Sequence, residues 1–314
     1  MITEKKAALV SIVIATYNGE SYLDKQLDSL FKQTYTNIEI IALDDRSSDN
    51  TRQILSDFAR ERSNMKVFFN EINIGFIKNF EKGCQLAEGE FVSFCDQDDY
   101  WDPYKIEKMV KAIEDYPIIY CDSILTDENL NKKETKISDY VNFKSWNNCL
   151  QLSVFCRIYA HTMLCRKSFL DKSFPFLDVI PPDWWLPYLS TFYGGMKYLP
   201  EPLVLYRQHE NNVAGIVGGR RKRMINQKIS ERKKIEKKKI RRRIQAFYDA
   251  CPENRIHEKK VLLALVKSYS SFSLSNNLKR SIIFFLHHRV LLAVKKYSTI
   301  HRYLFCLKMF FKIK

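Results

Sequence analysis

The sequence predicts an α/β fold, in which a mostly parallel sheet carries helices on both faces, followed by a basic α-helical extension. Short apolar runs rich in β-branched residues alternate with segments whose apolar residues recur at helical spacing. This alternation is typical of strand–helix–strand units. Polar residues directly follow several of the apolar runs, and the net charge changes sign near residue 215.

Continuous apolar runs predict strands that are buried on both faces of the sheet. Five of them lie at residues 9–15, 38–43, 67–69, 91–95 and 118–121. The segments between them predict helices, because apolar residues recur every three or four positions. The first has Leu23, Leu27, Leu30 and Phe31, the second follows a cap at Asp49 or Asn50, and two more span 76–87 and 104–115.

After Asp122 the alternation of apolar strand-like runs with helix-like segments becomes weaker. Residues 127–150 are interpreted as a polar excursion, and residues 154–165 as a return to the sheet. Pro181 and Pro182 open a predicted helix that continues through Trp184 and Trp185. Two short strands are predicted further on, at residues 196–199 and 203–206.

Polar side chains stand just past four of the predicted strand ends. They are Tyr17, Asp45, Asn73 and Asp96. In open parallel sheets, ligands bind at the carboxyl ends of the strands. The sequence therefore predicts that these residues share one site.

The segment Asp96-Gln97-Asp98-Asp99 follows the apolar run 91–95. Carboxylates spaced so closely repel each other unless a positive charge lies among them. A hard divalent cation satisfies them, and Mg²⁺ typically completes its shell with substrate phosphates. The alternative is an Asp-rich turn before the next helix. Asp102 fits such a cap, but that reading does not account for the other three carboxylates.

The charge divides the chain of 314 residues into two parts. Residues 1–215 carry 24 Lys and Arg against 31 Asp and Glu, a net charge of −7. Residues 216–314 carry 27 against 5, a net charge of +22. We therefore predict a mildly acidic domain over residues 1–215 and a basic amphipathic helical region over residues 216–314.

The eight cysteines have no Cys-x-x-Cys spacing, so reduced thiols in apolar sites are expected rather than a zinc site or disulfides. The N-terminal residues lack the pattern of a signal peptide, and no long uncharged apolar stretch predicts a membrane span. These features favour a cytoplasmic protein.

The basic region predicts an anionic partner. Residues 220–243 hold fourteen Lys and Arg, and residues 281–294 and 303–311 are apolar and aromatic with interspersed bases. Such segments are typical of helices in a membrane interface. We therefore expect peripheral attachment to the inner face of the cell membrane. The alternatives are a packed helical hairpin or a homo-oligomer contact, and nucleic acid is the less favoured anionic partner.

Together these residues resemble inverting glycosyltransferases of family 2, which have the GT-A fold. The resemblance covers residues 8–215 and is carried by Ser11-Ile-Val-Ile-Ala-Thr-Tyr-Asn18, Asp44-Asp45-Arg-Ser-Ser-Asp49 and Asp96-Gln-Asp-Asp99. Pro182-Asp-Trp-Trp185 and Leu205-Tyr-Arg-Gln-His209 fit the same family. The form Asp-Gln-Asp-Asp-Tyr-Trp looks most like bacterial rhamnosyltransferases that build cell-wall or capsular polysaccharide.

The resemblance implies a role for each motif. Asp98 would coordinate Mg²⁺ or Mn²⁺ and Asp96 would assist, with His209 as a third ligand, whereas Asp99 could equally hold its loop. The nucleotide would be bound by Thr16, Tyr17, Asp45 and Asn73, and the diphosphate by Arg207. Asp183 would be the general base, because inversion requires one carboxylate to take the proton of the acceptor hydroxyl. Its alternative role is to cap the helix that follows.

The sequence thus predicts a metal-dependent, inverting glycosyltransferase of bacterial surface polysaccharide synthesis. It would take a dTDP- or UDP-linked sugar, with rhamnose favoured, and a saccharide acceptor on a lipid carrier. One alternative is a transferase that uses a UDP-hexose. Another is a nucleic-acid-binding protein with a degenerate enzyme domain.

Overall fold

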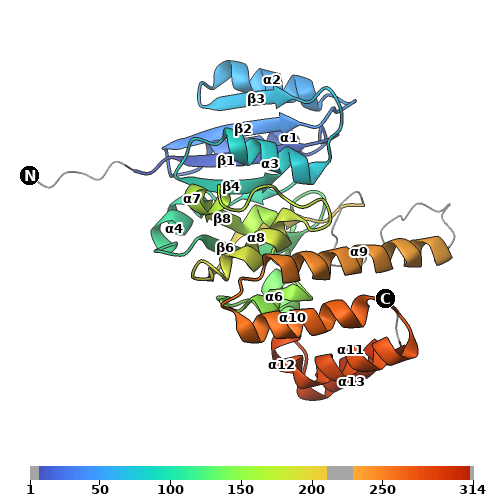
Figure 1. Cartoon of the computed structure of the whole chain (residues 1–314). Coiled ribbons are helices and arrows are strands. Elements are labelled where there is room, and N and C mark those ends of the chain that lie inside the picture. Colours follow the sequence, from blue (N-terminus) through green and yellow to red (C-terminus); the bar gives the residue numbers. More distant parts are fainter. Residues whose placement is uncertain (1–6, 211–228, 312–314) are drawn as a thin grey trace, which may run out of the picture. The chain divides into compact units, whose positions relative to one another are not determined.

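The computed structural model describes residues 7–210 and 229–311, which divide into two compact units (Figure 1). The first comprises the chain up to Asp139 together with Ile158–His209, and the second comprises Tyr140–Arg157 and the chain from Glu210 onward. The domain boundary predicted after residue 215 lies outside the described residues and stays a prediction.

The first unit is built on one mixed sheet of nine strands in the described part of the chain. The order is β3-β2-β1-β4-β8-β6-β9-β5, with β7 paired to β6. The strands β1, β2, β3 and β4 are parallel, whereas β8 is antiparallel to both β4 and β6. Their bounds are β1 Val10–Thr16, β2 Ile38–Asp44, β3 Met65–Phe69, β4 Phe91–Asp96, β5 Tyr100–Trp101, β6 Ile118–Thr126, β7 Lys132–Lys136, β8 Met163–Arg166 and β9 Met196–Arg207.

Helices cover both faces of this sheet, because successive side chains of a strand point to opposite faces. Alternate residues of β1, such as Ile12 and Ile14, share a buried cluster with helices α1 (Leu23–Phe31), α2 (Thr51–Glu61) and α4 (Lys105–Ala112). The opposite face packs on α3 (Phe76–Leu86). There a Cβ on Gly83 would lie 2.3 Å from Val13 Cγ1, so α3 approaches the sheet closely enough to require glycine.

The predicted fold class is confirmed, and the differences lie in the second half of the sheet. The two strands expected around residues 196–206 form the single strand β9, which runs parallel to β6 with register shifts near Asp122. The polar excursion at 127–150 contains β7 and two short helices, α5 (Ile137–Tyr140) and α6 (Cys149–Ser153). The return to the sheet is the 3-10 turn η1 (Ala160–Thr162) followed by β8 and α7 (Lys167–Leu170). Helix α8 (Pro182–Ser190) begins where the prolines predict.

The second unit is helical. It contains α6 with α9 (Ile229–Ala250), α10 (Ile256–Tyr269), α11 (Leu274–Leu286), α12 (His288–Leu291) and α13 (Thr299–Phe311). Phe247, Leu262, Leu265, Phe284 and Leu291 are among its buried apolar residues. Within residues 7–210 and 229–311, each helix is too short or too polar to cross a membrane. All eight cysteines are free, and seven of them are buried, as the sequence predicts.

Candidate active site

The ends of β1, β2 and β4 bring the predicted polar residues to one edge of the sheet. Thr16 is paired with Asp44, and Ala15 with Asp96, in the parallel registers of these strands. The backbone N–H of Asp45 donates to the carbonyl of Thr16 at 2.9 Å. The convergence follows from topology, because parallel strands end at the same edge.

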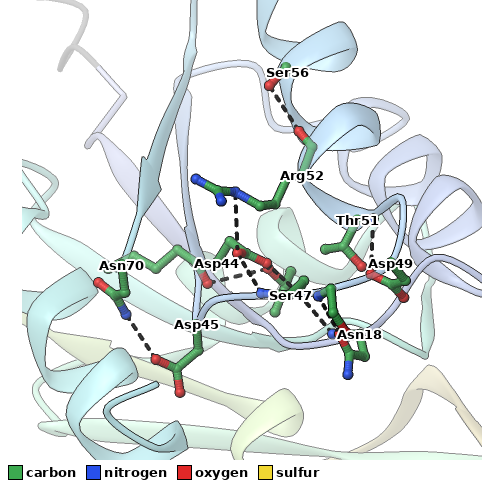
Figure 2. A network of polar contacts seen from close by, with 12 residues as sticks. Asn18, Asp44, Asp45, Ser47, Asp49, Thr51, Arg52, Ser56 and Asn70 are labelled. Atoms are coloured by element: carbon green, nitrogen blue, oxygen red, sulfur yellow. Dashed lines mark hydrogen bonds and ion pairs between the residues drawn. The ribbon is translucent and has the colours of Figure 1, made fainter. Parts of the chain in front are cut away.

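The loop after β2 is fixed by buried carboxylates (Figure 2). Asp44 is fully buried and accepts hydrogen bonds from the backbone N–H and the hydroxyl of Ser47, the former at 2.9 Å. The Ser47 hydroxyl also accepts the backbone N–H of Asn18 at 2.9 Å. Asp49 accepts the backbone N–H of Thr51, the first residue of α2, at 3.1 Å, whereas the N-cap position itself is Asn50. The loops after β1 and β2 are therefore one hydrogen-bonded unit.

Asp45 holds the loop before α3. Its buried carboxylate accepts the Asn70 amide at 3.0 Å and the backbone N–H groups of Ile74 and Gly75, both at 2.8 Å. The Asn73 amide donates to the Asp45 carbonyl at 3.0 Å. Gly75 reaches its position with φ 81°, a left-handed conformation that favours glycine. Since each carboxylate oxygen accepts two hydrogen bonds, Oδ2 of Asp45 retains capacity for one more.

Tyr17 lies between this loop and the acidic segment. Its backbone N–H donates to Gln97 Oε1 at 2.8 Å, and Gln97 Nε2 donates back to the Tyr17 carbonyl at 3.0 Å. Tyr17 is 51% exposed, so its ring is accessible to a planar ligand. Thr16 is buried, and its hydroxyl lies 3.3 Å from the carbonyl of Leu43.

Two of the three carboxylates at the end of β4, Asp96 and Asp99, lie against a buried histidine. Nδ1 of His161 is 3.2 Å from Asp96 Oδ2 and 3.1 Å from Asp99 Oδ2. Nε2 of the same ring is 3.1 Å from the Ser123 hydroxyl. Asp99 is fully buried, and burial together with the charges of Asp98 and Asp96 raises its pKa well above the usual range. The sheet edge therefore holds several carboxyl groups close together, an arrangement that favours either a proton on Asp99 or a positive charge among them.

Asp96, Asp99 and His161 could hold a metal ion, because one ligand atom from each lies within 4.8 Å of the others. A hydrogen on His161 Nδ1 can be donated to one of the two carboxylates, and its hydrogen bond goes to Asp96. Asp99 Oδ2 is then a buried acceptor with no hydrogen bond among the described residues. Carboxylate oxygens are the ligands that Mg²⁺ and Mn²⁺ prefer, so the residues present fit a divalent cation.

The predicted metal ligands Asp98 and His209 lie against each other instead. His209 Nε2 is 2.9 Å from Asp98 Oδ2, and the His209 ring packs on Tyr22 with centroids 4.5 Å apart. The metal set predicted from the sequence therefore shares only Asp96 with the clustered group. Which set binds the ion stays a prediction.

Arg207, predicted to bind the diphosphate, is buried at the end of β9. Its Nε donates to the Asp98 carbonyl at 2.7 Å, and one terminal nitrogen donates to the Glu128 carbonyl at 2.6 Å. The backbone N–H of Arg207 donates to Asp99 Oδ1 at 3.1 Å. Arg207 thus braces the acidic loop, and its predicted contact with a ligand stays a prediction.

Asp183, the predicted base, lies in the first turn of α8. Burial, followed by the nearby charge of Asp96, raises the pKa of Asp183 from 3.8 to about 7. Hydrogen bonds from its own backbone N–H and from that of Ala160 act in the opposite direction. A carboxylate with this pKa is a more effective base near neutral pH than one in water.

Two buried residues of this region escaped the sequence analysis. His161 stands in the turn η1, and the ammonium group of Lys105 donates to the His161 carbonyl at 2.9 Å. Lys105 is fully buried, which lowers its pKa to about 8. The only available signal for His161 was its position two residues before the short apolar run 163–165, and Lys105 had none.

Comparison with known proteins identifies relatives for most of the chain. The family model described as glycosyl transferase family 2 matches residues 11–172. An uncharacterized glycosyltransferase of Haemophilus influenzae is 30% identical over 225 residues, which cover 66% of this chain and 68% of the relative. The UDP-Glc:alpha-D-GlcNAc-diphosphoundecaprenol beta-1,3-glucosyltransferase WfaP of Escherichia coli is 30% identical over 66% of this chain and 80% of its own length. The chain spans only 60% of the length of relatives from Mycobacterium.

Two solved structures share the fold. Residues 1–349 of TarS from S. aureus, in complex with UDP-GlcNAc, match with a TM-score of 0.59 at 19% identity, over 97% of this chain and 81% of that one. The mannosyltransferase PcManGT from Pyrobaculum calidifontis, in complex with GDP-Man and Mn²⁺, matches with a TM-score of 0.53 at 12% identity, over 97% and 80%. At these identities the likeness establishes the fold alone.

The two sets of candidate ligands can be separated by binding of Mn²⁺, measured by electron paramagnetic resonance without any substrate. We expect Asp96→Asn and Asp99→Asn to weaken binding by roughly tenfold or more, because each removes a charged oxygen ligand. Asp102→Asn is the matched control, since Asp102 stands three residues after Asp99, beyond β5, and its carboxylate accepts the backbone N–H of Tyr104. If Asp98→Asn and His209→Ala abolish binding while Asp99→Asn spares it, the clustered group is not the site.

Proposed function

This chain belongs to glycosyltransferase family 2, an inverting family, and from that premise we propose that it transfers a hexose from a nucleoside-diphosphate sugar to a hydroxyl group of a saccharide. The observation that carries the proposal is that the carboxylates of the candidate metal cluster lie near the carboxylate of Asp183. A cluster suited to a divalent cation lies close enough to Asp183 for the charge of Asp96 to raise the pKa of Asp183.

We propose Asp183 as the general base. Its carboxylate takes the proton of the acceptor hydroxyl as the oxygen attacks the anomeric carbon, and the bond between that carbon and the diphosphate oxygen breaks. Attack from the face opposite the leaving group inverts the configuration. Mg²⁺ or Mn²⁺, when bound, supplies positive charge that stabilises the departing diphosphate. Asp96 and Asp99, with His161, are the residues that would hold the ion.

The nucleotide is proposed to bind at the loops after β1, β2 and β3. Asp45 Oδ2 can accept one further hydrogen bond and would take the ring N–H of a pyrimidine. Tyr17 would stack on the base, with the Thr16 backbone and Asn73 beside it. Arg207 remains the proposed contact of the diphosphate, although two of its donors already bind backbone carbonyls.

For the donor we favour a UDP-linked hexose. The name of WfaP specifies UDP-Glc, and TarS is seen with UDP-GlcNAc. The sequence motif Asp-Gln-Asp-Asp-Tyr-Trp instead favours rhamnose from a dTDP-linked donor, and that remains the alternative. Both nucleotides present the same pyrimidine N–H, so Asp45 would serve either one.

For the acceptor we propose a saccharide on a lipid carrier, in the synthesis of a bacterial surface polysaccharide. The WfaP name specifies a diphosphoundecaprenol-linked sugar as its acceptor. A lipid-linked acceptor would place the enzyme at the inner face of the cell membrane. The net charge of +22 on residues 216–314 supports attraction to an anionic membrane.

A donor screen tests the proposed reaction. The purified protein is incubated with Mn²⁺ and, separately, UDP-Glc, UDP-GlcNAc and dTDP-rhamnose, and release of the nucleoside diphosphate is measured. We expect slow hydrolysis of a UDP-linked sugar that stops when the ion is chelated. Hydrolysis of dTDP-rhamnose alone would establish the alternative donor. Absence of hydrolysis, with tight salt-sensitive binding of RNA or DNA, would instead indicate a degenerate enzyme domain.

The role of Asp183 is tested by Asp183→Asn. We expect transfer to fall by roughly 10²- to 10⁴-fold, because general base catalysis is lost, while the affinity for the UDP donor changes little. Turnover and UDP affinity are measured on the same preparations. Asp178→Asn is the matched control, since Asp178 is an exposed carboxylate on the segment before α8. A variant at position 183 that keeps wild-type turnover would place the base elsewhere.

The rate should depend on pH through the same group. Asp183 accepts a proton only when ionised, so kcat/KM should fall as the pH drops through its pKa. Without a cation that pKa is about 7. A cation at Asp96 cancels part of the charge that raises it, so at saturating Mn²⁺ the acid limb should lie at or below about pH 7. An acid limb that persists unchanged in the residual activity of Asp183→Asn would belong to another group.

A further inference from the structure

Helices α11 and α13 present an unusual number of large apolar side chains to solvent. On both α11 and α13 these exposed apolar residues recur every three or four positions. Each set therefore lies on one side of its helix. The two helices pack on each other within the second unit (Figure 1). We call this surface the apolar face; it consists of Leu274, Leu278, Ile282, Phe285 and Leu286 on α11 and Ile300, Tyr303, Leu304, Leu307 and Phe311 on α13.

The exposure does not come from loose packing, because the other side of each helix is buried. Phe284 is fully buried and Cys306 nearly so. The Ser281 hydroxyl donates to the Cys306 carbonyl at 2.9 Å and thereby ties α11 to α13. Phe285 and Tyr303 stack across the pair with ring centroids 5.3 Å apart. The apolar face is therefore a fixed surface of a packed helix pair, with Leu274 and Phe311 73% and 78% exposed.

The segment of the chain that carries the apolar face has charge of one sign. Between Lys259 and Lys314 the sequence contains twelve Lys and Arg and no Asp or Glu. Lys279, Arg289 and Lys308 are exposed bases on α11, α12 and α13 themselves. Monomeric proteins rarely leave a large apolar surface uncovered, so this one indicates a partner.

The charge decides among the occupants. A second copy of the chain would bring one positive surface against another, which like-charge repulsion opposes. Nucleic acid would pair with the bases but would leave the apolar side chains in water. An anionic bilayer takes both, since its acyl chains accept the apolar residues and its headgroups attract the bases.

We propose that the apolar face of α11 and α13 lies in the boundary between the headgroups and acyl chains of an anionic membrane. The helix pair would lie in the plane of the membrane rather than cross it, in keeping with its short helices. The proposal rests on the proposed function, which includes a membrane partner. It adds which residues make the contact with that membrane.

These residues differ from those that composition indicates. The sequence assigned the membrane contact to residues 281–294 and 303–311. In the structure, however, Phe284, Leu291 and Leu292 belong to the core of the helical unit, and Leu274 and Leu278 extend the apolar face toward the start of α11. The membrane contact of residues 281–294 stays a prediction, and burial leaves Ile282, Phe285 and Leu286 of that segment on the apolar face.

Vesicle cosedimentation of the full-length protein tests the proposal. We expect binding to vesicles of mixed phosphatidylcholine and phosphatidylglycerol, and much weaker binding to phosphatidylcholine alone. The combined change of Leu278, Ile282, Leu304 and Leu307 to Gln should reduce partitioning by roughly a hundredfold, because four apolar side chains no longer enter the bilayer. All four are exposed, so folding should be unaffected, which circular dichroism and the melting temperature check.

The matched control is Ile256→Gln. Ile256 is 63% exposed in the same unit but stands at the start of α10, outside the apolar face. It should bind vesicles like the wild type. Equal binding of the fourfold variant and the wild type would overturn the proposal. So would a wild-type dimer in sedimentation velocity that the fourfold variant converts to monomers, with vesicle binding unchanged.

A tryptophan reporter locates the contact independently. With lipids brominated on the acyl chains, fluorescence of Phe285→Trp should be quenched more strongly than that of Ile256→Trp, because only residue 285 lies on the apolar face. The four native tryptophans contribute equally to both variants. Equal quenching in the two variants would contradict insertion of the apolar face.

Hydrolysis of the donor separates this proposal from the proposed function. The fourfold variant should hydrolyse the nucleotide sugar in solution at the wild-type rate, because no residue of the apolar face belongs to the candidate active site. Vesicle binding without any hydrolysis would contradict the proposed function alone, and hydrolysis without vesicle binding would contradict the membrane contact alone.

Discussion

The buried charge of Asp99 is the constraint on which the rest of the site depends. Ligand atoms of Asp96 and Asp99 lie within 4.8 Å of each other. Two charges at that separation repel by about 3–4 kcal/mol at an effective dielectric constant of about 20. A hydrogen bond to a charged group contributes about 1.5–3 kcal/mol. The hydrogen bonds from His161 and the Arg207 backbone therefore offset the repulsion energy of about one pair of carboxylates. The nearby carboxylate of Asp98 adds the repulsion of a further pair. The raised pKa of Asp99 reflects this imbalance, which either a proton or the proposed divalent cation would relieve.

The turn Ala160–His161 contacts both the candidate metal ligands and the proposed general base. The His161 ring contacts Asp96 and Asp99, while the backbone N–H of Ala160 hydrogen bonds to Asp183. Lys105 fixes the carbonyl of the same turn from within the core. A shift of this turn would therefore move the candidate metal carboxylates, Asp96 and Asp99, together with the proposed base. Such coupling suits a displacement in which attacking and leaving oxygens must be aligned, because misplacement by about 1 Å lowers rates greatly.

Sequence alone located the strand ends because their physics is local. Apolar runs such as 9–15 and 91–95 are typical of buried strands, and parallel strands bring Thr16, Asp45 and Asp96 to one edge whatever their separation in the chain. His161 was missed because it stands 65 residues from Asp96 and reaches it through β8, a short antiparallel strand inserted between β4 and β6. Lys105 was missed because a lysine in an amphipathic helix is normally solvated. In the tail, composition identified apolar segments but could not assign Phe284 to the core and Leu278 to the surface.

Among the described residues, one buried base of the helical unit is held without a carboxylate, and its Nε has no hydrogen bond. Arg280 is almost fully buried, a position in which a guanidinium is normally paired with an acid. Here it donates to the Asn277 side chain and to the carbonyls of Ser268 and Ser271, and it lies 4.1 Å from the centre of the Tyr269 ring. Its charge is thus stabilised by dipoles and an aromatic face. Near an anionic surface a basic residue contributes about 1 kcal/mol of attraction, and an acid would offset it. Pairing Arg280 with carbonyls instead of an acid therefore keeps the whole segment beyond Lys259 positive, which is the arrangement that an anionic partner favours.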